Sequence, residues 1–286
     1  MSDLPPVPPE PAPRAPGLPP RSPGPSADPH AAWAGPPERP DLDLPRATWR
    51  WWEVVIVYLG AQIVGLIVST PLIVVLDDDP SPERIGGLVL IVSSIVIDLV
   101  LFGVAYLWLQ RLHPTWRRIM GFPARDRWSR EVAAGFVASL VILFVSGIVG
   151  AGIRYLLEAV EDRSIVQPDQ IPDDLNAVGL VLTIVFACLI APIVEEFVFR
   201  GLLFRSIRDR YGLLAGVLVS GIIFGGVHFG VDGGGLAENL LLQIPLAVVG
   251  IGFALVYEMR KNLIAPIAAH VMFNVIGVIV ILGNLS

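Results

Sequence analysis

The sequence predicts an all-α integral membrane protein, a polytopic bundle of about seven transmembrane helices. Of its 286 residues 54% are hydrophobic and 16% are charged, and the mean hydropathy is +0.68. A soluble globular domain carries about 25% charged residues, so this composition is typical of a chain embedded in lipid. Seven apolar stretches are also long enough, at about 20 residues, to cross a bilayer as helices. They are residues 53–76, 86–109, 132–157, 177–199, 212–230, 239–258 and 263–284.

The first 45 residues differ in composition from the rest of the chain. Sixteen of the 26 prolines lie between Pro5 and Pro45, mainly with alanine, glycine and serine between them. Such a segment buries too little apolar surface to offset the entropy lost on ordering. It also lacks the basic start and apolar centre of a signal peptide. We therefore expect a disordered, proline-rich cytoplasmic tail over residues 1–45 and a transmembrane domain over residues 46–286.

The charges of the connecting loops alternate along the chain. Arginine and lysine gather in residues 110–131, 200–211 and 259–262, whereas aspartate and glutamate gather in 77–85 and 158–176. Loops rich in arginine and lysine stay on the cytoplasmic side of a membrane. Seven spans place all the basic loops on one side, so we expect a cytoplasmic N-terminus and an external C-terminus. In a prokaryote the membrane would be the plasma membrane.

Composition also excludes several kinds of function. The single cysteine, Cys188, lies in an apolar stretch, so the chain has neither an internal disulfide nor a cysteine-based zinc cluster. No basic domain with interleaved aromatic residues is present, so nucleic acid is not an expected partner. The partner that composition does indicate is the lipid bilayer.

Two carboxylates and an arginine, Glu195-Glu196-x-x-x-Arg200, end the fourth apolar stretch. Each ionisable group deep in hydrocarbon costs roughly 2.5–3.5 kcal/mol on insertion scales, so such groups mark a polar, functional interior. On a helix Glu196 and Arg200 share one face and can pair, whereas Glu195 points elsewhere. One glutamate would then be neutralised while the other stays free for chemistry. The alternative is a charge cluster that faces water at the membrane end.

Two histidines lie inside later apolar stretches. His228 follows Phe224 by four residues, and His270 precedes Asn274 by four, so each pair shares a helix face. A lone histidine in a membrane is more often a hydrogen-bonded packing residue. Two histidines, an asparagine and a glutamate pair together favour a functional site.

Depth in the membrane decides whether these residues can meet. If the helix that carries Glu195 continues to about Asp209, Tyr211-Gly212 forms the turn of an antiparallel helix pair. Glu195 lies 16 residues before position 211 and His228 lies 17 after it. At about 1.5 Å per residue the two would lie at nearly equal depth.

Two other residues within the apolar stretches are unusual there. Pro192 lies three residues before Glu195, frees a backbone carbonyl and is expected to bend the helix. Asp98 is a lone acid in the second stretch. We expect it to pair within the bundle, with support of a functional site as the alternative.

The three motifs together resemble those of the CPBP intramembrane proteases, which include type II CAAX prenyl endopeptidases and ABI bacteriocin-immunity proteins. The motifs are Glu195-Glu196-x-x-x-Arg200, Phe224-x-x-x-His228 and His270-x-x-x-Asn274. The resemblance covers about 177–280 and implies a protease core there, with a polar intramembrane cavity open to the cytosol. It also implies hydrolysis of a peptide bond in a membrane-associated peptide or protein, of the prenylated CAAX type in the eukaryotic branch.

Roles for that reaction follow from the groups. Glu195 would be the general base, His228 would hold the same water, and His270 and Asn274 would donate to the oxyanion. In a metal-dependent version, Glu195, His228 and His270 would bind zinc, with water in the fourth position. The His-Glu-x-x-His zinc signature is absent, and the metal-dependent and metal-free versions both stay open.

Two other classes of protein carry similar residues. A proton-coupled transporter also keeps glutamate, arginine and histidine inside the membrane, although it more often shows internal repeats, and we see none. A non-catalytic scaffold or bacteriocin-immunity protein of the same fold would have the same motifs. Replacement of Glu195 by glutamine separates these classes from an enzyme, because only an enzyme would lose turnover of a peptide.

Overall fold

The computed structural model of the chain describes residues 44–76, 86–165, 171, 172, 174–229 and 235–284. All of these residues lie in one compact unit, Leu42–Ser286, and Met1–Asp41 is the other unit of the chain. Apart from Leu44 and Pro45, the predicted tail therefore lies outside the described residues.

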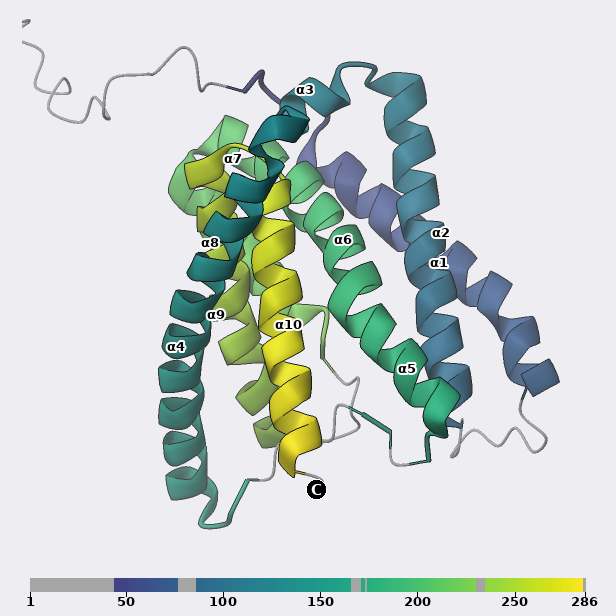
Figure 1. The fold of residues 1–286 in the computed structure, drawn as a ribbon, viewed down its shortest axis with the longest axis vertical. Coiled ribbons are helices and arrows are strands. Elements are labelled where there is room, and N and C mark those ends of the chain that lie inside the picture. The colour runs from purple at the N-terminus through teal and green to yellow at the C-terminus, as the bar shows by residue number, and fades with distance from the viewer. Residues whose placement is uncertain (1–43, 77–85, 166–170, 173, 230–234, 285–286) are drawn as a thin grey trace, which may run out of the picture. The chain divides into compact units, whose positions relative to one another are not determined.

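Every regular element among the described residues is a helix, so the predicted all-α fold is confirmed (Figure 1). The elements are α1 (Trp51–Leu76), α2 (Gly87–Leu112), α3 (Trp116–Met120), the 3-10 helix η2 (Arg125–Arg127), α4 (Trp128–Glu161), α5 (Ala177–Val185), η3 (Phe186–Ile190), α6 (Ala191–Glu196), η4 (Phe197–Phe204), α7 (Arg205–Tyr211), α8 (Leu213–Gly226), α9 (Leu236–Arg260) and α10 (Ile264–Asn284). The elements from α5 to α7 follow one another without a break. We call this continuous helix, residues 177–211, the central helix.

Six helices among the described residues are long and apolar enough to cross a membrane. They are α1, α2, the stretch Trp116–Glu161 that contains α3 and α4, the central helix, α9 and α10, and they correspond to six of the seven predicted spans. The remaining prediction, 212–230, is the shorter helix α8. With 14 residues, α8 is about 21 Å long at 1.5 Å per residue, which is less than the ~30 Å of a bilayer core. It ends at Gly226, and residues 227–229 form a turn.

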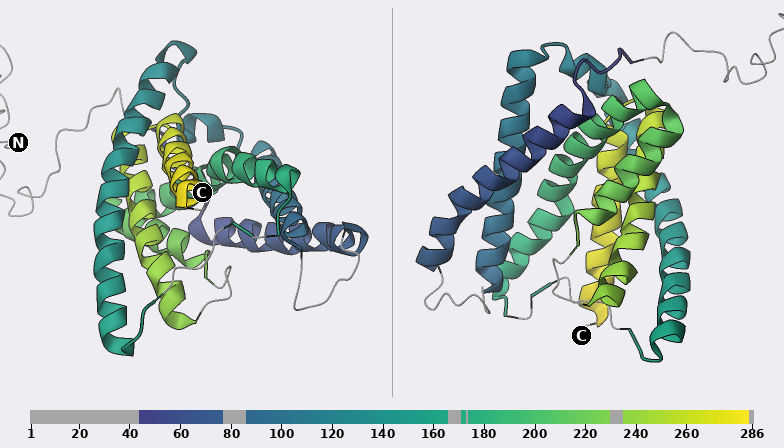
Figure 2. Two further views of the ribbon diagram at one scale, coloured as in Figure 1. Left: turned by 60° about the horizontal axis from the view of Figure 1, so that its bottom comes forward. Right: turned by 180° about the vertical axis from the view of Figure 1, so that it is seen from behind.

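The helices pack in two groups on either side of the central helix (Figure 2). In one group α1 packs along α2. In the other, α8 packs on α9, and α4 packs on both α9 and α10. Glycine allows α8 to lie close to α9, because a Cβ atom at Gly225 would be 2.5 Å from the carbonyl oxygen of Gln243. The central helix therefore contacts both groups along its length.

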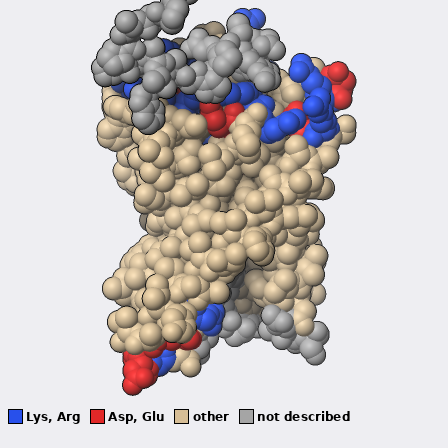
Figure 3. Space-filling view, turned by 90° about the vertical axis from the view of Figure 1, so that its left-hand side faces the viewer, with Lys and Arg blue, Asp and Glu red and all other residues tan. Residues whose placement is uncertain are grey.

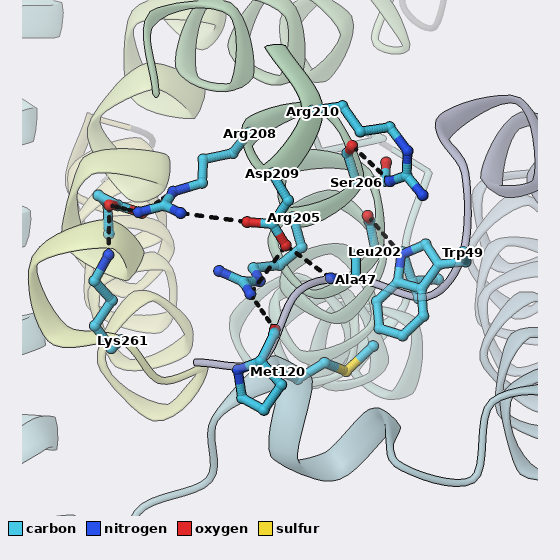
Figure 4. Close-up of polar contacts among 12 residues, drawn as sticks. Ala47, Trp49, Met120, Leu202, Arg205, Ser206, Arg208, Asp209, Arg210 and Lys261 are labelled. Atoms are coloured by element: carbon cyan, nitrogen blue, oxygen red, sulfur yellow. Dashed lines mark hydrogen bonds and ion pairs between the residues drawn. The ribbon is translucent and has the colours of Figure 1, made fainter. Parts of the chain in front are cut away.

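The segment before α1 is bonded to the end of the central helix (Figure 4). The indole Nε1 of Trp49, whose side chain is fully buried, donates to the carbonyl oxygen of Leu202 at 3.0 Å. The backbone N–H of Ala47 donates to Asp209 at 2.8 Å, and Arg205 donates to the carbonyl oxygen of Pro45 at 2.6 Å. Residues 45–49 are therefore part of the folded helix bundle.

On the face shown in Figure 3, charged side chains lie at the two ends of the bundle and leave a wide band of surface without them. At the end with Arg205, the chain after α9 meets the chain after α3, where Leu263 N–H donates to the Gly121 carbonyl oxygen at 3.2 Å. At the other end, Arg163 pairs with Glu238 at 2.7 Å. The basic loops thus share one end, as the charge alternation predicted.

Candidate active site

The central helix is not a regular α-helix where it carries the two glutamates. Two π-helical segments, η3 and η4, flank the six-residue α6 that ends at Glu196. Pro192 has no N–H to donate to the carbonyl oxygen of Cys188, and the widened turn of η3 directly precedes this gap in the hydrogen-bond ladder. The helix then continues to Tyr211, and Gly212 turns the chain with a φ of 90°. The predicted helix pair with its turn at Tyr211-Gly212 is confirmed.

Glu196 and Arg200 form the predicted ion pair inside the bundle. Arg200 Nη1 lies 2.7 Å from Glu196 Oε1, and both side chains are 0% exposed. Arg200 Nη2 also donates to the carbonyl oxygen of Gly250 in α9 at 2.8 Å. The guanidinium lies over the rings of Phe224 and Phe253, at 4.6 and 5.2 Å from their centroids. For this pair, the alternative of a charge cluster facing water is wrong.

His270 from α10 contacts both glutamates. Its Nδ1 lies 3.0 Å from Glu196 Oε1, and its Nε2 lies 3.8 Å from Glu195 Oε2. Its ring stacks on Phe253, with centroids 4.7 Å apart. An ionised carboxylate can only accept, so Nδ1 carries the hydrogen in the bond to ionised Glu196. The ring is thereby held with Nε2 near Glu195.

Glu195 and His228 line one cavity of about 130 Å³. The predicted equal depth of the two residues is confirmed. The other lining residues are Tyr58, Gln62, Asp98, Leu101, Phe199 and Val227. His228 belongs to the turn after α8, and its Nδ1 lies 2.8 Å from the carbonyl oxygen of Phe224. A carbonyl oxygen only accepts, so Nδ1 is the donor there and Nε2 is the basic nitrogen of neutral His228.

Asn274 makes a contact that the sequence did not predict. Its side-chain amide donates to the carbonyl oxygen of Ala187 at 2.7 Å. Ala187 lies in η3, so this hydrogen bond ties α10 to the widened turn of the central helix. Asn274 is not one of the residues that line the cavity.

The predicted zinc ligands Glu195, His228 and His270 do not form a three-ligand group in this conformation. Within the described ranges, no set of three histidine, cysteine, aspartate or glutamate side chains is placed to hold a metal ion. The Nδ1 atoms of His228 and His270 face a backbone carbonyl and Glu196 respectively. We therefore derive no catalytic step through a metal.

Three polar residues that line the cavity were not predicted as catalytic or metal-binding residues. Tyr58 and Gln62 come from α1, and Asp98 comes from α2. The sequence features that could have identified them are the lone acid in a membrane span and the two polar residues four apart on an apolar helix. The expected pairing of Asp98 within the bundle is not observed, because it makes no hydrogen bond or ion pair with any described residue.

Comparison with known proteins gives two relatives and a family. Residues 177–276 match the family model described as type II CAAX prenyl endopeptidase Rce1-like. A Bacillus subtilis (strain 168) protein named "Putative membrane peptidase YdiL" is 32% identical over 146 residues, which are 51% of this chain and 53% of that protein. An uncharacterized protein of Mycoplasma capricolum subsp. capricolum (strain California kid) is 27% identical over 129 residues, 45% of this chain and 36% of that protein.

The chain thus spans about half the length of the first relative and about a third of the second. No solved structure matches the chain. The matched segment begins at the start of α5 and includes all the residues of the three motifs. The segment 177–276 of this chain therefore matches the Rce1-like family model, the resemblance that its motifs predicted.

Proposed function

We propose that the protein is an intramembrane endopeptidase in which Glu195 activates water to hydrolyse a peptide bond. The observation that carries this proposal is the unequal placement of two adjacent glutamates. Glu196 is fully buried on Arg200 and His270, whereas Glu195 lines the cavity together with His228. A carboxylate in a cavity beside a histidine is the pairing that general-base chemistry needs.

In the proposed reaction, Glu195 carries a proton from the attacking water to the leaving amine. Glu195 removes a proton from water, and the hydroxide adds to the carbonyl carbon of the substrate. Glu195 then returns the proton to the amine nitrogen as the carbon–nitrogen bond breaks. His228, whose Nδ1 donates to the Phe224 carbonyl oxygen, lines the same cavity and would hold the water. The Tyr58 hydroxyl lines the same cavity and is a donor for the oxyanion.

Arg200, Glu196 and His270 support the base in this proposal. Arg200 and His270 both bond to Oε1 of Glu196, so the carboxylate fixes the orientation of the imidazole. A fixed imidazole next to Glu195 keeps the catalytic carboxylate oriented, as a third group does in hydrolytic triads. Asn274 supports the site indirectly, through its hydrogen bond to the backbone of η3.

We propose a membrane-associated protein as the substrate, with a prenylated CAAX protein as the first class to test. The description of the matching family model names a type II CAAX prenyl endopeptidase. The cavity lies between membrane-spanning helices, and outward residues of α1 such as Ile56 and Ile63 are exposed. A substrate that is anchored in the bilayer therefore matches the surroundings of the cavity.

Comparison of membrane proteins from cells that express wild type or Glu195→Gln tests this function. New peptide ends that appear only with wild type identify substrates and cleaved bonds. Asp126→Asn, at an exposed position in the 3-10 helix η2, is the matched control and should behave as wild type. Identical peptide ends in all three would contradict the enzyme and favour a scaffold. A proton flux that Glu195→Gln abolishes without any change in peptide ends would favour a transporter.

A further inference from the structure

Part of the cavity wall comes from outside the segment that matches the family. Tyr58 and Gln62 lie four residues apart on one face of α1, and Asp98 joins them from α2. We propose that these three residues form a subsite for a positively charged group of the substrate, a lysine or arginine side chain beside the scissile bond. The proposal deepens the proposed function and rests on it.

Asp98 differs from most acidic side chains of the membrane-spanning helices. Six of them have arginine partners: Glu131 with Arg260, Glu161 and Glu238 with Arg163, Glu196 with Arg200, Asp209 with Arg205, and Glu258 with Arg208. Asp98 has no hydrogen bond or ion pair with any described residue. An ionisable group inside a membrane is expensive and marks a functional site. Its position on the cavity indicates a ligand as the partner.

The charges of the cavity indicate the sign of that ligand. Asp98 and Glu195 are both carboxylates, and no described lysine or arginine lines the cavity. Carboxylates attract a cation much more strongly in a poorly solvated cavity than in water, and they repel an anion there. The Tyr58 hydroxyl and the Gln62 carbonyl oxygen can accept further hydrogen bonds from an ammonium or guanidinium. A basic side chain satisfies all of these groups at once.

Tyr58 also connects this subsite to the central helix, which carries Glu195. Its ring packs against Phe199 of η4, with centroids 6.3 Å apart. Phe199 follows Glu195 by four residues and lines the same cavity. A side chain bound by Asp98 and Tyr58 would therefore lie next to the bond that is attacked by the water that Glu195 activates.

The test uses the full chain in detergent micelles and peptides built on a bond cleaved only by wild type. Fluorogenic versions carry lysine, glutamine or glutamate beside that bond. Wild type should cleave the lysine peptide about 30-fold more efficiently than the glutamine peptide, mainly through KM, and the glutamate peptide least. Asp98→Asn should bring the lysine and glutamine peptides to within about threefold of each other. Asp126→Asn, the control, should keep the wild-type order.

Binding without cleavage separates failure of the subsite from failure of the enzyme. Hexylammonium should raise the melting temperature of wild type more than that of Asp98→Asn, whereas hexanol should act equally on both. The subsite is overturned, and the protease stands, if wild type cleaves lysine and glutamine peptides alike or Asp98→Asn keeps the preference. If nothing is cleaved but hexylammonium still discriminates, the subsite stands and the protease does not. Asp98→Ser replaces Asp98→Asn should the latter fail to fold.

Discussion

Nδ1 of His270 lies 3.0 Å from Oε1 of Glu196, the same oxygen that accepts from Arg200 at 2.7 Å. One carboxylate oxygen thus joins the central helix to α10 and fixes the imidazole beside Glu195. This relationship divides two neighbouring glutamates into one that holds the site together and one that faces the cavity.

Glu195→Gln should strongly reduce turnover without loss of the fold. Glutamine keeps the size and the hydrogen-bonding capacity of the side chain but cannot take a proton. Loss of a positioned general base typically costs about 10²–10⁴-fold in rate. Cleavage by the purified variant, with its melting temperature as the control, checks this expectation. A fully active Glu195→Gln would rule out the assigned role.

Glu196→Gln should instead lower stability. It leaves the buried guanidinium of Arg200 without its counter-charge, and breaking a buried pair costs about 3–5 kcal/mol. Arg200→Gln should have a similar effect, and the double variant should recover part of the loss because no lone charge remains. Melting temperatures of the three variants measure this. Normal melting of Glu196→Gln, together with unfolding of Glu195→Gln, would reverse the two roles.

Residues 2–43 and Trp49 should differ sharply in how much they contribute to stability. Deletion of residues 2–43 removes none of the bonds that join Ala47 and Trp49 to the central helix, so melting should not change. Trp49→Ala should cost about 3–5 kcal/mol, as expected for a buried tryptophan. Thermal melting of the two proteins gives the comparison. A strongly destabilised deletion variant would show that residues 2–43 contribute to the fold.

Acidification should destabilise the protein through His113, which follows α2 and whose Nδ1 lies 2.8 Å from the hydroxyl oxygen of Thr48. Burial of His113 lowers its pKa, because the charged imidazolium is disfavoured there. The unfolded value is about 6.5, so the unfolded chain takes up more protons as the pH falls below it. Stability from this group is present above about pH 6.5 and is lost below it. Melting between pH 8 and 5.5 should fall less for His113→Gln than for wild type.

Loss of the Asn274 amide should loosen η3. Asn274→Leu leaves the Ala187 carbonyl oxygen without its donor, and an unsatisfied buried group costs about 1–3 kcal/mol. Amide hydrogen exchange should therefore increase in the central helix around η3 and stay unchanged in α4. Equal exchange in both proteins would show that this bond does not hold the widened turn.

Cysteine labelling tests the predicted orientation in the membrane. In a Cys188→Ala background, Asp126→Cys and Tyr211→Cys should react with an impermeant reagent from the cytosolic side only. Ser164→Cys, at the opposite end, should react from outside only. All three positions are exposed, so access to the reagent depends on the side of the membrane. Labelling of Ser164→Cys from the cytosol would overturn the predicted orientation.

Local spacing was enough to predict much of this architecture. Hydropathy located six long helices, and the i,i+4 spacing of Glu196 and Arg200 predicted their ion pair. Counting residues from Tyr211 placed Glu195 and His228 at one depth. These predictions succeed because a helix converts separation in sequence directly into angle and distance.

Contacts between distant helices could not be predicted in this way. The register of α10 against the central helix could not be predicted from the sequence, so the contact of His270 with Glu196 appears only in the structure. The wall with Tyr58 and Asp98 depends on how the pair α1–α2 packs against the central helix, and the widened turns depend on helix packing around Pro192. The span predicted from apolar length, 212–230, is also longer than α8, because hydropathy does not show that the helix ends at Gly226.

The π-helical segments have a consequence for the angular phase of the central helix. A π turn closes its hydrogen bond one residue later than an α turn, so it contains about one more residue. Removing one residue from η3 would let that turn close as an α turn, and because both kinds of turn complete about one revolution, the later side chains would keep their direction. The same deletion in α5 would instead rotate every later side chain by about 100° relative to the start of the helix. The widened turn of η3 therefore absorbs one extra residue without changing the direction in which Glu195 and Arg200 point.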